Sequence, residues 1–270
     1  MIHMPRRASK WMNRIFHGEG RTAPLDWGTE LWKWGVSRYE SADGISAALL
    51  RAGKSADDFS VLYEATRNLL LDVVDAAGGV EQAHHRLHEA MAGAREAQAR
   101  FAASFGRPAE DGMGLSDPTV EAAWYAIEEL ILWTRILDDR LRRPALDHKR
   151  YPDQGLIPAL ADGPRRDAVI AARSRLLQGG VQEARYLAGL NLHMQSSQAG
   201  TKHGRIKDGE VILQFPDRVT APIGHRWQLT YRDGRDAVTF ADGLMEAVAR
   251  FMDDMIRAFE EHLPERFQAS

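Results

Sequence analysis

The segment from Asp117 to Arg143 constrains the fold of this chain more than any other. Its apolar residues recur at steps of three and four, which places them along one face of a long α-helix. They are Val120, Ala123, Trp124, Ile127, Leu130, Ile131, Leu137 and Leu141. Asp117 is a favourable N-cap, and Pro118 is tolerated at the first helical position because its missing N–H has no partner to lose there. A helix of this length, roughly 40 Å, can form the centre of a bundle.

Three further helices are expected before this segment. The first is short, at about residues 44–52, the second carries an apolar face from Phe59 to Val73, and the third extends from about Val80 to Phe105. Gly78-Gly79 between the second and the third indicates a turn, since paired glycines interrupt a helical pattern. Helices joined by so short a turn lie antiparallel.

Helical patterns also follow the central segment. One covers Pro164 to Gln178 and the next Val181 to about Gln198, with a turn at Gly179-Gly180 between them. Asp236 caps a last long helix that extends to Leu263. Together these patterns predict a mainly α fold, an antiparallel bundle of six to eight helices.

The apolar period changes between residues 203 and 232, where apolar and polar residues alternate as in β-strands. Asp208-Gly209, between Ile206 and Val211, is a strong signal for a two-residue hairpin. A further strand is expected at Trp227–Tyr231. The bundle should therefore contain a small β-hairpin or three-strand insertion before its C-terminal helix, packed on the helices because it is too small to be stable alone.

The expected domain organisation is a basic amphipathic arm at residues 1–25 followed by a single helical domain at residues 26–270. Prolines gather in the connector 144–164, which marks a sub-boundary or a functional loop. The β insertion at 203–232 belongs to the same domain.

Composition excludes several classes of protein. Apolar residues make up 44% and charged residues 27% of the chain, and the net charge is -3, so the protein is not basic overall. The absence of cysteine excludes disulfides, thiolate catalysis and cysteine-ligated metal centres. No apolar stretch approaches the roughly 20 residues of a membrane span. We expect a soluble, cytoplasmic protein.

Two groups of basic residues could contact an RNA or an acidic protein partner, and the basic face of the arm could also contact acidic lipid. The members are Arg6, Arg7, Lys10 and Arg14 in the arm, and Arg165, Arg166, Arg173 and Arg175 in the helix after the connector. The alternative for the arm is that its apolar face packs on the bundle while its arginines remain in water.

The segment Glu183–Gln198 holds a second candidate site. It is apolar almost all round, which predicts an internal helix, yet it contains Arg185, Tyr186, Asn191 and His193. Buried polar groups need partners. An arginine that holds a phosphate beside a histidine that transfers a proton is sufficient for metal-free RNA cleavage.

A helical bundle with an Arg and a downstream His on one late helix resembles the HEPN superfamily of RNases and nucleotide-binding proteins. The resemblance covers about residues 117–198. It implies that Arg185 holds the phosphate, His193 transfers the proton, Asn191 is the polar member, and two copies meet in a homodimer. Seven residues separate Arg185 from His193 here, whereas the family has four to six. The alternative is a structural Arg185 paired with Glu128 or Glu129 and a hydrogen-bonded core His193.

His84 and His88 are one helical turn apart and could share a metal ion, with Glu81 nearby. His85 stands where the zinc-protease motif has its glutamate. A position at the edge of the core, half in solvent, accounts for these histidines without an ion.

Paired acids occur at Asp138-Asp139 and Asp253-Asp254. Each pair has arginines within one helical turn, so we interpret these acids as solvated ion pairs rather than magnesium ligands. We therefore expect no metal and no cofactor.

Two functions are consistent with these observations. One is a non-catalytic binding or regulatory protein that contacts a protein or RNA partner. The alternative is a HEPN-like, metal-independent ribonuclease that uses Arg185 and His193.

Overall fold

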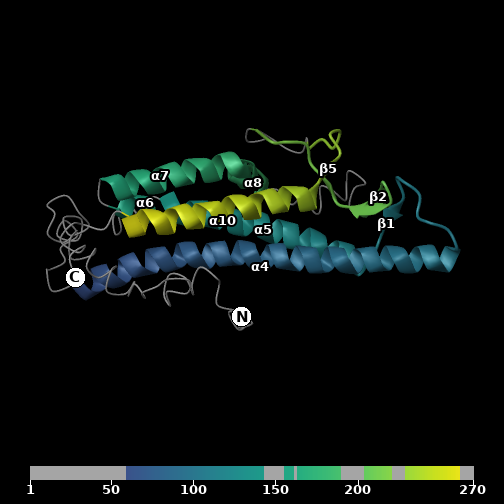
Figure 1. The fold of residues 1–270 in the computed structure, drawn as a ribbon, viewed down its shortest axis with the longest axis horizontal. Coiled ribbons are helices and arrows are strands. Elements are labelled where there is room, and N and C mark those ends of the chain that lie inside the picture. The colour runs from purple at the N-terminus through teal and green to yellow at the C-terminus, as the bar shows by residue number, and fades with distance from the viewer. Residues whose placement is uncertain (1–58, 143–154, 161–162, 190–203, 221–228, 262–270) are drawn as a thin grey trace. The chain divides into compact units, whose positions relative to one another are not determined.

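The computed structural model of the chain describes residues 59–142, 155–160, 163–189, 204–220 and 229–261 (Figure 1). Within them the predicted mainly α, antiparallel bundle with a small sheet before the C-terminal helix is confirmed. The helices are α4 (Phe59–Phe105), α5 (Pro118–Arg142), α6 (Leu156–Ala159), α7 (Pro164–Leu176), the π-helical turn η3 (Leu177–Val181), α8 (Gln182–Leu187) and α10 (Ala237–Glu261). None of these helices combines the length and the apolar character that crossing a membrane requires.

The strands form two small antiparallel sheets. One has the order β1 (Gly114–Leu115), β2 (Gly204–Lys207), β3 (Glu210–Ile212), and the other pairs β4 (Gln214–Phe215) with β5 (Arg235–Asp236). Asp208 and Gly209 join β2 to β3 with φ angles of 51° and 78°, the paired positive values of a tight hairpin turn. The predicted hairpin is confirmed.

A strand was expected at Trp227–Tyr231, but the residues of this segment that the structure describes form none. Trp227 and Gln228 lie outside the described ranges, and Leu229, Thr230 and Tyr231 are in no strand. The segment instead folds around the Asp217 carboxylate, which accepts hydrogen bonds from the N–H groups of Arg232 (3.0 Å) and Asp233 (2.8 Å). The chain consequently curls, and β4 pairs with Arg235–Asp236 further on.

The turn predicted at Gly78-Gly79 is wrong, because α4 continues through both glycines as one helix. Gly79 serves close packing instead. A Cβ placed there would lie 2.7 Å from Cε2 and Cε3 of Trp133 on α5, and closer still to Cδ2 of the same ring. Only a residue without a side chain lets the indole approach the backbone of α4 so closely.

By backbone packing the chain divides into two compact units, each made of several chain segments. The first comprises residues up to Gly78, Ile136–Arg175 and Arg250 onward. The second comprises Gly79–Arg135 and Leu176–Ala249. Helices α4, α5 and α10 therefore contribute residues to both units, whereas the sheets belong to the second. The short helix expected at about residues 44–52 lies outside the described residues, and the proline-rich connector 144–164 lies mostly outside them.

Helix α5 confirms the prediction for the central segment. The eight stripe residues named for it are all buried. Asp117 caps the helix: its Oδ1 accepts a hydrogen bond from the Thr119 N–H at 2.9 Å and another from the Thr119 hydroxyl. These bonds lower the pKa of the Asp117 carboxyl below its ordinary value.

Ion pairs within the first unit involve two of the acids singled out in the sequence. The buried Asp138 carboxylate contacts Arg173 Nε at 2.7 Å and Arg142 Nε at 3.2 Å. Asp254 accepts from Arg175 Nη2 at 2.8 Å. The predicted ion pairing is confirmed for these acids, but Asp138 is fully buried rather than solvated, so its charge depends on these arginines.

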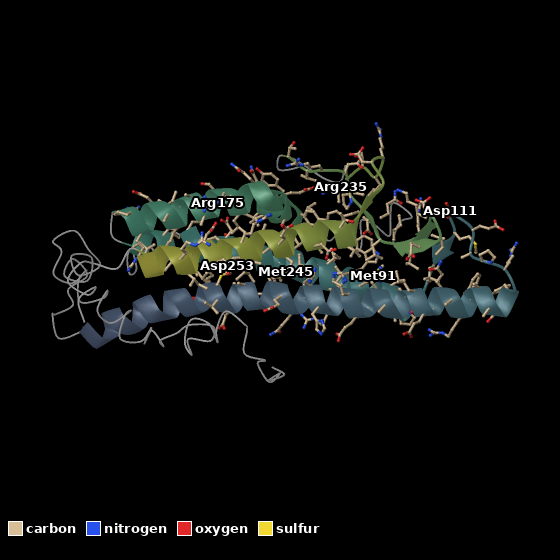
Figure 2. The ribbon with its side chains drawn as sticks, viewed as in Figure 1. Met91, Asp111, Arg175, Arg235, Met245 and Asp253 are labelled. Atoms are coloured by element: carbon tan, nitrogen blue, oxygen red, sulfur yellow. The ribbon has the colours of Figure 1, made fainter. Side chains whose placement is uncertain are left out.

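A second buried ion pair lies within the second unit. Arg235, just before α10 (Figure 2), donates two hydrogen bonds to Glu183 of α8, at 2.7 and 3.2 Å. Its guanidinium also lies 5.5 Å from the Phe215 ring centroid and 5.4 Å from that of Phe240. The pair joins α8 to the start of α10.

Gly79→Ala should destabilise the protein by about 2 kcal/mol, because overpacking against Trp133 outweighs the gain of about 1 kcal/mol in helix propensity. Gly243→Ala in α10 is the matched control: nothing lies within 4 Å of its added Cβ, so it should stabilise slightly. Urea unfolding measures both. A Gly79→Ala variant as stable as Gly243→Ala would contradict the packing role.

Asp138→Asn should lower the free energy of unfolding by about 2–3 kcal/mol, because Arg173 loses its buried carboxylate partner. The exposed Asp167 of α7 is the control position, and Asp167→Asn should change stability by less than about 0.5 kcal/mol. Equal effects of the two substitutions in urea unfolding would show that the Asp138 pairing adds nothing.

Candidate metal centre

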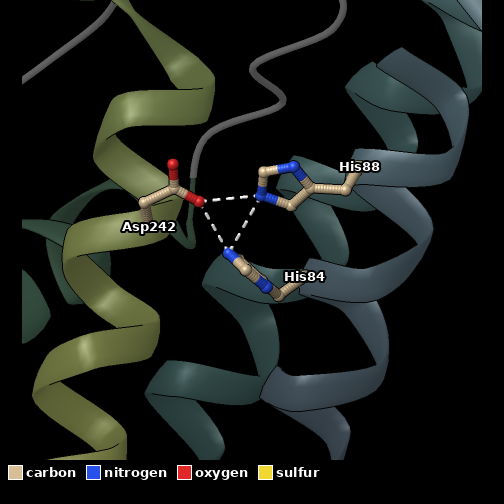
Figure 3. Close-up of side chains that lie close together, drawn as sticks. All are labelled: His84, His88 and Asp242. Carbon is tan, nitrogen blue, oxygen red and sulfur yellow. Dashed lines mark hydrogen bonds and ion pairs between the residues drawn. The ribbon is translucent and has the colours of Figure 1, made fainter. Parts of the chain in front are cut away.

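The side chains of His84, His88 and Asp242 converge in the second unit. The histidines stand one turn apart on α4, and Asp242 lies in the second turn of α10 (Figure 3). Helices α4 and α10 run antiparallel here (Figure 1). Asp242 lies more than 150 positions along the sequence from the two histidines, and the three residues are called the triad below.

The positions of the triad follow from the apolar faces of its two helices. On α4 the buried residues Ala83 and Leu87 directly precede His84 and His88. On α10 the buried Ala241 directly precedes Asp242. Because residues next to an apolar stripe lie at its edge, burying the two stripes brings the three polar side chains to the rim of the interface.

The triad atoms form a small triangle. His84 Nε2 lies 2.7 Å and His88 Nε2 2.8 Å from Oδ1 of Asp242, and the two nitrogens are 3.2 Å apart. Ligand atoms bonded to one metal at about 2.1 Å are separated by roughly 3 Å when the angle at the metal is near 90°. The triangle therefore has the dimensions of three ligands on a common ion.

Protons can satisfy two of these three contacts. If both Nε2 atoms carry a proton, each donates a hydrogen bond to Oδ1 of Asp242, at 2.7 and 2.8 Å. The third contact, 3.2 Å between the two Nε2 atoms, then lies between two donors and is not a hydrogen bond. A cation at the centre would accept a lone pair from each of the three atoms at once.

The electrostatics of Asp242 keep its carboxylate charged. Partial burial raises the pKa of this carboxyl, but the hydrogen bonds and positive charges of His84 and His88 outweigh burial and lower the pKa below its ordinary value. The side chains are also open to water, with 23% of His84, 43% of His88 and 51% of Asp242 exposed. An ion could therefore reach the triad from solvent.

His85 is not part of the triad. Its side chain is 61% exposed and its Nε2 lies 3.2 Å from Glu89 Oε1, one turn along α4. Glu81, which the sequence placed near the histidines, is also not among the grouped ligand atoms. The third ligand is Asp242, which sequence reasoning missed.

One signal could have pointed to Asp242. It borders the buried stripe of α10, yet no Lys, Arg or His stands within four residues of it to form a helical ion pair. An acid at a core edge with no local cation needs a partner from elsewhere in the fold. The identity of that partner is not readable from the sequence, since it depends on how α4 and α10 pack.

The proposed ribonuclease residues are described only in part. Asn191 and His193 lie outside the described residues, while Arg185 and Tyr186 are half-buried on α8. The Tyr186 hydroxyl accepts a hydrogen bond from Gln182 at 2.8 Å. Of the two acids suggested as partners of Arg185, Glu129 pairs with Arg86 at 2.6 Å. Because His193 lies outside the described residues, the structure does not test the Arg185–His193 pairing.

The basic residues proposed to contact RNA are described only in part. Arg165 is buried, Arg166 is half-buried, and Arg173 and Arg175 bind the carboxylates of Asp138 and Asp254. Arg6, Arg7, Lys10 and Arg14 of the arm lie outside the described residues. At least two of these cations therefore already have carboxylate partners within the protein.

The donor set of the triad, two imidazoles and one carboxylate, is the kind that first-row transition metals take in proteins. Magnesium and calcium prefer oxygen ligands throughout. Comparisons with protein-family models, with curated proteins and with solved structures found no match to this chain.

Proposed function

We propose that this protein binds a divalent first-row transition metal ion, of the Zn²⁺ class, through Nε2 of His84, Nε2 of His88 and Oδ1 of Asp242. The observation that carries the proposal is the triangle of 2.7, 2.8 and 3.2 Å separations, which brings two imidazole nitrogens and one carboxylate oxygen to the spacing of ligands on one ion. One cation accommodates all three atoms. All three residues of the triad lie in the part of the chain that the structure describes.

The functions expected from the sequence remain separate proposals. Contact with a protein or RNA partner rests on basic residues of which half lie outside the described residues, and metal-independent RNA cleavage rests on His193, which also lies outside them. Metal binding is preferred because its three ligand atoms meet within the described part of the chain.

Zn²⁺ titration of the full chain, stripped of metal with a chelator and followed by calorimetry, tests the proposal. We expect one ion per chain. His84→Ala, His88→Ala and Asp242→Ala should each weaken binding by about 100-fold or more, since even the outer partners of metal ligands contribute about 10–100-fold. His85→Ala should bind as the unsubstituted protein does, because His85 points to Glu89. Loss of binding in His85→Ala alone, or binding that all variants retain, would refute the site.

Zn²⁺ should also raise the melting temperature of the protein. The ligands come from α4 and α10, so the folded state should bind the ion more tightly than the unfolded chain. At a free concentration of 100 times Kd the stabilisation is about 2.7 kcal/mol. Differential scanning fluorimetry of the protein and of Asp242→Ala checks this, with Mg²⁺ as the control ion. A shift of equal size in Asp242→Ala would place the stabilising ion elsewhere.

A further inference from the structure

The triad supplies three ligand atoms, one fewer than a closed structural zinc site. Structural sites are closed by four protein ligands, whereas sites with three keep a position for water or another molecule. Among the described residues, no fourth His, Asp or Glu joins the triad. The number of protein ligands is thus that of an open centre.

The three ligand atoms also lie on one side of the place a metal would occupy. With bonds of about 2.1 Å, separations of 2.7, 2.8 and 3.2 Å correspond to angles of roughly 80–100° at the metal. Tetrahedral angles would need separations of about 3.4 Å. The triad therefore has the form of a facial set, which leaves the opposite hemisphere of the ion without a ligand from it.

The surroundings of Asp242 are consistent with solvent molecules reaching the open side of the ion. Half of the Asp242 side chain and more than two fifths of the His88 side chain are exposed to solvent. The next residue, Gly243, has no side chain, and nothing lies within 4 Å of the position its Cβ would take. The space beside the α10 backbone at Gly243 is therefore open.

We infer that the metal at this centre binds a small anion with oxygen or nitrogen donors, such as a hydroxamate, a carboxylate or azide, directly and from solvent. This inference rests on the proposed metal binding. A divalent ion held by one carboxylate and two neutral imidazoles carries a net charge of about +1, which favours an anion over a neutral ligand. His85 occupies the position of the zinc-protease glutamate, so the inference concerns ligand binding and includes no hydrolytic step.

Co²⁺-loaded full chain tests the inference, because the visible spectrum of Co²⁺ changes when its coordination changes. Azide and acetohydroxamate are titrated separately into the loaded protein. We expect a saturable spectral change with one anion per metal, and Co²⁺ should remain on the protein after gel filtration. The Co²⁺-loaded His85→Ala variant, in which the triad is intact, should respond in the same way.

The possible failures are distinguishable. If Co²⁺ binds in one equivalent but neither anion changes its spectrum, the centre is closed and this inference is wrong, while metal binding stands. If the anions remove Co²⁺ from the protein, the inference is also overturned. If the unsubstituted protein binds neither Co²⁺ nor Zn²⁺, the proposed function itself fails.

Discussion

Close approach of helices through small residues is the constraint on which the second unit depends. Gly79 lets the Trp133 indole rest against the backbone of α4, and Gly179 leaves so little room that an added Cβ would lie 2.5 Å from Cβ of Ala247 on α10. Side chains at either position would push neighbouring helices apart by about the width of a methyl group. The triad joins α4 and α10 at the edges of their buried stripes, with contacts of 2.7 and 2.8 Å. Its geometry therefore depends on how the apolar faces of these two helices pack.

The packing of helices also determines which charged side chains become partners in this protein. Asp138 is fully buried and retains two arginine contacts, and Glu183 is almost fully buried against Arg235. Breaking such pairs leaves an uncompensated charge in the interior, which is more costly than the pair is favourable. Arg173 and Arg175, which the sequence offered as RNA contacts, pair with acids on neighbouring helices, and the Arg175 side chain remains 60% exposed.

The triad differs from these ion pairs in the kinds of atoms that it brings together. A guanidinium and a carboxylate complement each other in charge and in hydrogen-bond geometry. In the triad two imidazole nitrogens and one carboxylate oxygen lie at mutual distances near 3 Å, and all three atoms can act as metal ligands. That difference distinguishes a candidate ligand site from a structural network.

Local features determined much of the fold from the sequence alone. The cap at Asp117, the hairpin at Asp208-Gly209 and the cap at Asp236 each depend on interactions within a few residues, so their patterns predicted them correctly. The apolar stripe of α5 was readable for the same reason, since helical spacing decides which residues share a face. Gly78-Gly79 resembled a turn, and only the Trp133 ring across the interface explains why the helix continues.

The candidate site was also readable only in part. The sequence showed His84 and His88 one turn apart, whereas Asp242 joins them only when α4 and α10 pack together. Contacts between distant segments are set by shared burial and not by local spacing.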